Sequence, residues 1–211
     1  MAKQRLKSPR ARLFVALDLP DAVRGGLEAW QARECADEAL RAIAPEALHV
    51  TLCFLGYHPE RAIEEIAGVI AAVPARPVPM RLEPEPVGIR GRRPGLYAIA
   101  APSEAAFSLH AELSARLSER RFYKPEKRPF WPHVTVARVR PERSSEGGPK
   151  RRRRGRPRVV ERPPGDLPAD LLRPFGAVRA ALYRSHLRPS GARYERLAAL
   201  ELPPATSGRE R

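Results

Sequence analysis

A short pattern that occurs twice places the tightest constraint on this chain. The sequence His49-Val50-Thr51-Leu52 recurs as His133-Val134-Thr135-Val136. Each copy lies in a run of alternating polar and apolar residues rich in β-branched side chains, which predicts a strand. Successive side chains of a strand point to opposite faces. Each histidine therefore shares one face with the threonine two positions later, and the apolar pair faces a core.

Strict alternation also predicts which neighbours accompany the two histidines. It places Cys53 on the face of His49 and Thr51. It turns Arg138 away from His133 unless that strand contains a bulge or a bend. The first histidine is therefore predicted to have a thiol beside it, and a contact between Arg138 and the second histidine's ligand depends on an irregular strand.

The repetition favours a joint chemical role for the two histidines. A single histidine in a strand is more often a structural residue, but two in matching contexts indicate an acid–base pair. Imidazoles have a reference pKa of ~6.5, so one can donate a proton while the other accepts one near neutral pH. No carboxylate or histidine stands at ligand spacing beside either motif, and Cys35 and Cys53 lack the spacing of a zinc site. We therefore expect no metal and no cofactor.

The net charge of +15 is concentrated in two segments of the 211-residue chain. Residues 1–12 contain only basic charges, and residues 141–165 contain the run Lys150-Arg151-Arg152-Arg153-Arg154. Both segments lack apolar periodicity and are rich in Pro, Gly or Ser, which is typical of disorder. We predict a basic disordered tail at 1–11, one domain at 12–202 with an Arg-rich disordered insertion at 141–165, and a second tail at 203–211. The insertion is expected to add at most accessory affinity for RNA, through its contacts with phosphates.

The remaining pattern alternates strands and helices in two comparable halves. Helices are expected from Pro20, from about Pro59 to Val73, and after Ser103 as the N-cap. Strands are expected at 12–18, 48–55, 96–100, 133–139, 177–183 and 194–200, with an edge strand at 78–82. Each half contributes one His-x-Thr strand. This pattern predicts an α+β fold with pseudo-twofold symmetry and a site between two lobes.

The sequence has no apolar run near 18 residues and no secretory leader. We therefore expect no membrane span and a cytoplasmic location. Nothing in the pattern requires more than a monomer.

Several segments together resemble the 2H phosphoesterases, and within them the RNA 2′,3′-cyclic phosphodiesterase family, historically called 2′-5′ RNA ligases. The similarity spans roughly residues 11–202, and the order, spacing and flanks of its motifs agree. The segments are Arg12-Leu13-Phe14-Val15-Ala16-Leu17, residues 45–52 with Phe54-Leu55-Gly56, Phe130-Trp131-Pro132-His133-Val134-Thr135-Val136-Ala137-Arg138, Ser185-His186-Leu187 and Gly191-Ala192-Arg193-Tyr194.

The resemblance implies a bilobal, metal-independent fold of two antiparallel β-sheets with outer helices and a central active site. It implies hydrolysis of a terminal 2′,3′-cyclic phosphate on RNA to a 2′-phosphate. On this sequence His49 would be the proton donor to the leaving 3′ oxygen, and His133 would be the base that activates water. Thr51 and Thr135 would hold the phosphate oxygens.

Other residues near the motifs are further candidates for substrate contacts, and the motifs are compatible with two alternative functions. Arg138 is a candidate phosphate contact. Phe130 and Trp131 are candidates for stacking on a base, with core packing as the alternative for Trp131. One alternative function is ATP-independent 2′-5′ ligation of tRNA halves, which makes tRNA fragments candidate partners. Another is a non-catalytic RNA-binding protein, although the unbroken pair of histidines argues against it.

Overall fold

A computed structural model describes residues 9–89, 93–142, 155–188 and 191–205. Within these residues the α-helices are α1 (Asp21–Glu34), α2 (Ile63–Ala71) and α3 (Glu104–Glu119). The strands are β1 (Arg10–Asp18), β2 (Leu40–Ala42), β3 (His49–Pro59), β4 (Pro79–Met80), β5 (Pro86–Ile89), β6 (Leu96–Ala100), β7 (His133–Val139), β8 (Phe175–Gly176), β9 (Arg179–Arg188) and β10 (Gly191–Glu201).

Eight of the strands form one antiparallel sheet, in the order β10-β9-β1-β3-β7-β6-β5, with β2 paired to β7. The strands β4 and β8 form a separate two-stranded sheet. The two motif strands β3 and β7 meet through a single pair, Val50 with Val134. The predicted α+β class is therefore confirmed. Its two main lobes are joined through the motif strands in one sheet, with β10-β9-β1-β3 on one side of the junction and β7-β6-β5 with β2 on the other.

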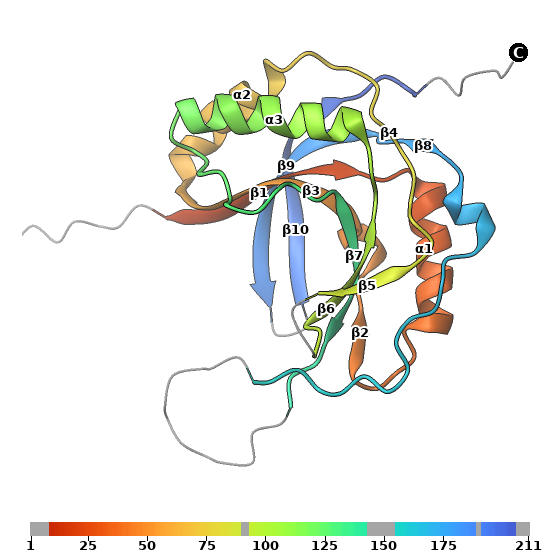
Figure 1. Cartoon of the computed structure of the whole chain (residues 1–211). Helices are drawn as coiled ribbons and strands as arrows, with labels where there is room; N and C mark the ends of the chain where they lie inside the picture. The colour runs from red at the N-terminus through yellow and green to blue at the C-terminus, as the bar shows by residue number, and fades with distance from the viewer. Residues whose placement is uncertain (1–8, 90–92, 143–154, 189–190, 206–211) are drawn as a thin grey trace, which may run out of the picture.

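Helices α1 and α3 each bury one apolar face. Helices α2 and α3 lie side by side, and α1 lies apart from them (Figure 1). Helix α1 buries Leu27 and Trp30, and α3 buries Leu113 and Leu117. The hydroxyl of Ser103 accepts the backbone N–H of Ala106 at 3.1 Å, so the predicted N-cap is confirmed.

Residues 155–165 of the Arg-rich insertion are hydrogen-bonded to the rest of the domain, so the prediction of disorder was wrong for this part. The backbone N–H of Arg158 donates to the Arg140 carbonyl at 2.9 Å, and that of Glu142 donates to the Arg156 carbonyl at 2.8 Å. The carboxylate of Asp37 accepts the N–H groups of residues 161 and 162. These long-range bonds, which the local composition does not reveal, order 155–165. Residues 143–154 lie outside the described residues.

The N-terminal boundary also moves, because β1 begins at Arg10 by pairing with β3 at Pro59. Residues 1–8 of the predicted tail, and 206–211 of the second one, lie outside the described residues. Three short strands, β2, β5 and β8, were not expected, because their pairing partners rather than their own residues define them. Within the described ranges no helix combines the length and apolarity needed to cross a membrane.

Candidate active site

Both motif strands contain a bulge at the fourth residue of the repeated pattern. In β3 the partner residues on β1 skip Leu52, and in β7 the partner residues on β6 skip Val136. A bulge adds one residue to one strand, so the side chains that follow exchange faces. The sixth residues of the two motifs, Phe54 and Arg138, therefore join the histidine face. This pair of bulges is a structural symmetry that the sequence repeat alone does not reveal.

The side chains on that face line one cavity of about 430 Å³, which we call the two-histidine groove. It contains both histidines and both threonines of the repeated pattern. Three arginines also reach it, one each from β1, β2 and β7. The lining residues are Arg12, Phe14, Arg41, Ile43, Ala47, His49, Thr51, Phe54, Leu96, His133, Thr135, Arg138, Ser185, Leu187, Ala192 and Tyr194.

A backbone contact orients the ring of His133. Its Nδ1 lies 2.7 Å from the carbonyl oxygen of Trp131, so Nδ1 carries the proton and donates it. The other ring nitrogen, Nε2, then has a free lone pair in the neutral imidazole. The indole of Trp131 stacks on the ring at 4.4 Å with an interplanar angle of 17°. His133 is thus held in the tautomer that a general base at Nε2 requires.

The ring of His49 is held by an equivalent contact and is more enclosed. It forms a hydrogen bond with the backbone of Ala47, two residues earlier, and its Nε2 lies 3.1 Å from the Thr51 hydroxyl. Burial lowers the pKa of His49 to about 4, and the nearby His133 and Arg138 also act to lower it. Without substrate His49 is therefore neutral at pH 7, and its Nε2 accepts the Thr51 hydroxyl proton.

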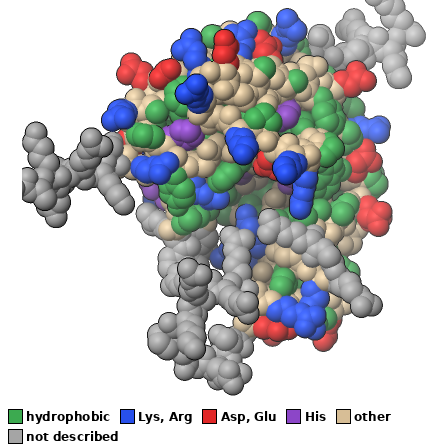
Figure 2. Space-filling model, turned by 60° about the vertical axis from the view of Figure 1, so that its left-hand side comes forward, with side chains coloured by type: hydrophobic (Ala, Val, Ile, Leu, Met, Phe, Trp, Pro, Cys, Tyr) green, Lys and Arg blue, Asp and Glu red, His purple; other side chains and the backbone are tan. Residues whose placement is uncertain are grey.

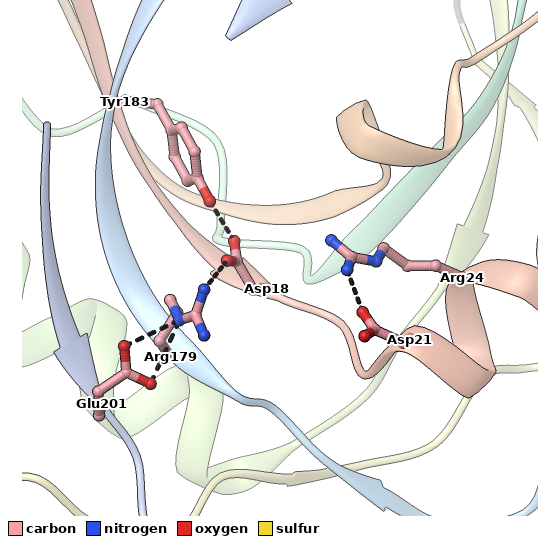
Figure 3. Close-up of polar contacts among 6 residues, drawn as sticks. All are labelled: Asp18, Asp21, Arg24, Arg179, Tyr183 and Glu201. Carbon is pink, nitrogen blue, oxygen red and sulfur yellow. Dashed lines mark hydrogen bonds and ion pairs between the residues drawn. The ribbon is translucent and has the colours of Figure 1, made fainter. Parts of the chain in front are cut away.

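Aromatic rings support His49 from two sides. Phe14 stacks on it with centroids 5.1 Å apart, and Tyr194 meets it edge-on at 5.3 Å. Behind Phe14, Tyr183 stacks at 5.3 Å. Figure 3 shows the Tyr183 hydroxyl pointing to Asp18, to which it donates a hydrogen bond at 2.5 Å. The structure thus links a buried carboxylate to the histidine through two stacked rings.

The Asp18 carboxylate is the centre of a polar cluster below this stack. Arg179 lies 3.6 Å from it and also pairs with Glu201 at 3.0 Å (Figure 3). Burial and the hydrogen bond to Asp18 raise the pKa of Tyr183. The phenol therefore stays protonated and continues to donate to the carboxylate. The cluster anchors β1 to β9 and β10 beneath the groove.

Removing the Tyr183 hydroxyl is expected to weaken folding without changing the groove. A hydrogen bond to a charged partner contributes about 2 kcal/mol, so Tyr183→Phe should lower the free energy of unfolding by that amount. The ring that stacks on Phe14 is retained. Urea denaturation measures the change, with Tyr57→Phe, in which the side chain is 53% exposed, as a matched control that should be neutral. Equal midpoints for the two variants would contradict the role given to this bond.

A known protein family matches the part of the chain that contains both copies of the repeated pattern. The model of the 2′-5′ RNA ligase superfamily matches residues 19–154, which include both His-x-Thr strands. The chain belongs to the 2′-5′ RNA ligase superfamily. The resemblance inferred from the motifs is thereby confirmed.

Curated members of the superfamily are modestly similar to this chain. The RNA 2′,3′-cyclic phosphodiesterase of Escherichia coli (strain K12) is 32% identical over 132 residues, covering 60% of this chain and 71% of the relative. The protein of the same name from Thermus thermophilus is 29% identical over 134 residues, covering 60% and 68%.

Solved structures extend the similarity to most of the chain. A protein of Thermus thermophilus superposes with a TM-score of 0.69 at 26% identity, covering 90% of this chain and 97% of that one. E. coli LigT complexed with 3′-AMP superposes with a TM-score of 0.68 at 20% identity, covering 92% and 99%. At this identity the LigT comparison shows a shared fold.

Arg12 also lines the groove, although the composition of the sequence does not predict this. The composition groups it with the basic N-terminal segment, but pairing of β1 with β3 brings it beside the site. Its guanidinium lies 4.5 Å above the ring of Phe54 and donates to the Ser185 hydroxyl at 3.1 Å. The place of Arg12 at the start of the family pattern was the available signal. Tyr194 and Ser185 also stood in that pattern without an assigned role.

The two bulges determine where Cys53 and Arg138 lie, and the sequence made a prediction for each of them. Cys53 is fully buried in the core, so the prediction that it lies on the catalytic face was wrong. Phe54 occupies the groove there. Arg138 does reach the groove, through the bulge that the prediction required. The carbonyl of Val136 at that bulge accepts the side-chain amide of Gln31 at 2.6 Å and the N–H of Ile43 at 2.9 Å.

The two aromatic residues before His133, Phe130 and Trp131, contact different parts of the structure. Phe130 stacks on His110 of α3 at 4.1 Å and meets Phe107 edge-on, so it packs against the helix and does not line the groove. Base stacking by Phe130 stays a prediction that the structure does not test. Trp131 covers His133 and is 38% exposed. It remains a candidate for stacking on a base.

The other histidines lie outside the groove. His58 contacts the Leu55 carbonyl, and His186 pairs with Glu195. Among the described residues there is also no group of three or more His, Cys, Asp or Glu side chains placed to hold a metal ion. Of the five histidines, only His49 and His133 line the groove.

Proposed function

We propose that this protein hydrolyses the terminal 2′,3′-cyclic phosphate of RNA to a 2′-phosphate by acid–base catalysis with two histidines. One observation carries the proposal. Two strands with matching bulges present His49 and His133 to one groove, each with its ring hydrogen-bonded to the backbone two residues earlier. The names of the curated relatives agree with this activity.

The hydrolysis needs one proton removed and one delivered. In the proposed mechanism Nε2 of His133 takes a proton from water as the water oxygen forms a bond to phosphorus. The bond from phosphorus to the 3′ oxygen breaks, and His49 donates its proton to that oxygen. Each positioned proton transfer typically contributes on the order of 10²–10⁴-fold in rate. The products are a free 3′ hydroxyl and a 2′-phosphate.

Because the pKa of His49 is low in the substrate-free protein, His49 can act as the proton donor only if substrate binding raises that pKa. Burial and the positive charge of Arg138 disfavour the imidazolium. A bound cyclic phosphate brings a negative charge that offsets this repulsion and raises the pKa of His49. Thr51 can then turn its hydroxyl from Nε2 of His49 to a phosphate oxygen. Substrate binding and protonation of His49 are therefore coupled.

The remaining polar groups of the groove suit an anionic ligand. The proposal assigns the Thr51 and Thr135 hydroxyls to the non-bridging phosphate oxygens, where negative charge increases in the transition state. Arg138 on one lobe and Arg12 on the other add cationic donors to the groove. Trp131 is assigned to the terminal base.

The decisive experiment is turnover of an oligoribonucleotide ending in a 2′,3′-cyclic phosphate, in the presence of EDTA. We expect a 2′-phosphate product, identified by NMR. A 3′-phosphate product would reverse the assignment of the leaving oxygen. Absence of turnover, together with joining of two tRNA halves, would replace hydrolysis by ligation as the function.

Removing the charge of Arg138 is expected to raise the pKa of His49. The guanidinium repels a proton on the imidazole, so Arg138→Gln should make His49 easier to protonate. NMR titration of the ring resonances without substrate measures the pKa directly. Arg61→Gln, which changes an exposed arginine outside the groove, should leave it unaltered. An unchanged or lowered pKa in Arg138→Gln would show that this charge does not act on His49.

A further inference from the structure

A second cavity adjoins the two-histidine groove. Its volume is about 830 Å³, and it shares Arg41, Leu96 and Arg138 with the groove. Its remaining lining comes from the segment before β6, from the end of β7 with residues 140–141, and from residues 155–158. A ligand held in the groove can therefore continue past Arg138 into the second cavity.

The lining of the second cavity carries charge of one sign, and we call it the arginine cavity. Of the twelve described residues that line it, six are arginines and none is Asp or Glu. Figure 2 shows several Lys and Arg side chains on the face of the molecule that it draws. The arginines are Arg41, Arg93, Arg138, Arg140, Arg156 and Arg158.

Arg93 and Arg140 each have a protein partner. Arg93 pairs with Glu142 at 2.5 Å, and the Nε of Arg140 donates to the Leu40 carbonyl at 3.1 Å. These contacts lie at the edge of the cavity and hold its walls. They also neutralise one of the six charges.

Arg156 and Arg158 are different, because their backbone is fixed and their side chains have no ion pair or hydrogen bond within the described residues. The Arg156 carbonyl accepts from Glu142, and the Arg158 N–H donates to Arg140. A bridge between residues 141 and 157 lies between these two bonds. Two guanidinium groups are thus presented on an ordered backbone at the wall of a cavity.

A run of arginines on a convex surface is usually a solvated face. Here the charges line a concave surface that is continuous with a groove suited to a phosphate. Guanidinium groups bind phosphate oxygens through paired N–H donors. Phosphates of a nucleic acid backbone recur along the chain, so cations along a continuous path suit a strand rather than a single nucleotide.

We propose that the arginine cavity binds phosphodiesters of RNA upstream of the reacting end, with Arg156 and Arg158 as positioning residues. This inference rests on the proposed function and specifies its substrate class as a single-stranded oligonucleotide. The terminal nucleotide occupies the two-histidine groove, and the preceding nucleotides pass Arg138 into the arginine cavity. Binding there is independent of base sequence, because the contacts are made to phosphates.

The test compares the double variant Arg156→Gln/Arg158→Gln with the wild type. A fluorescent hexaribonucleotide ending in a 2′-phosphate is titrated by anisotropy at several salt concentrations. We expect the dissociation constant to rise about tenfold or more at low salt, as two charge-assisted contacts are lost. The salt slope should fall by about 1.4, since each contact to a single strand contributes about 0.7. Turnover of a nucleoside 2′,3′-cyclic phosphate should not change.

A matched control removes the same charge elsewhere. Arg61→Gln/Arg76→Gln changes two exposed arginines that line neither cavity, and it should bind the hexaribonucleotide as the wild type does. Wild-type affinity in Arg156→Gln/Arg158→Gln, or an equal loss in the control, would overturn the proposal. The binding assay needs no turnover. An inactive wild type would therefore refute the proposed function, while the comparison of the dissociation constants would still test the arginine cavity.

Discussion

Replacing either groove histidine by alanine is expected to lower kcat by about 10²–10⁴-fold, because each imidazole transfers one proton in the transition state. The double variant should be little worse than the poorer single variant, since a proton donor and acceptor that act in one step are not additive. Rates are measured with the cyclic phosphate oligoribonucleotide in EDTA. The pH profile should lose the limb that belongs to the missing group.

The control for the histidine variants is His186→Ala. His186 is on β9, pairs with Glu195 and does not line the groove, so its removal should leave kcat unchanged. Thermal unfolding checks that His49→Ala remains folded despite the space left beside Phe14. A folded His49→Ala or His133→Ala with the wild-type rate would remove that residue from the mechanism.

The second large effect is expected from the two threonines of the repeated pattern. Thr51→Val and Thr135→Val retain the shape of the side chain and replace a hydroxyl donor by a methyl group. Loss of one preorganised donor to a developing negative charge typically lowers kcat by about 10²–10³-fold. We expect this effect on kcat rather than on KM, because the interaction strengthens in the transition state.

The conservative variants Thr51→Ser and Thr135→Ser separate this role from packing. Serine keeps the hydroxyl and loses only a methyl group, so it should recover most of the rate that valine loses. The same low rate in serine and valine variants would indicate that the methyl group, rather than the hydroxyl, matters. A wild-type kcat in both valine variants would exclude the threonines from phosphate binding.

Much of this site follows from the sequence because it depends on local periodicity. Alternation along a strand is sufficient to put His49 with Thr51 and His133 with Thr135 on one face. Both pairs line the same groove in the structure. The buried faces of α1 and α3 and the Ser103 cap follow from helical spacing in the same way. These features need only neighbouring residues and a general preference to bury apolar surface.

After the fourth residue of each motif, the direction of the side chains depends on how the strand pairs with a distant strand. Alternation would put Cys53 in the groove, but the bulge at Leu52 places it in the core and brings Phe54 to the groove. In β7 the corresponding bulge is satisfied by Gln31 of α1, which is 105 positions away in sequence. A bulge is defined by how a strand pairs with its partner strand, which lies far away in the sequence, so neighbouring residues alone do not predict it.

The sequence by itself determined the reacting groups, their threonine partners and the core-facing sides of the main elements, because these depend on residue type and on periods of 2 and 3.6. Only the tertiary structure decided that Arg12 and Tyr194 reach the groove, that Phe130 packs on α3, and that Arg156 and Arg158 line an ordered cavity. The physical reason is that each of these positions is set by hydrogen bonds and packing between segments far apart in the chain.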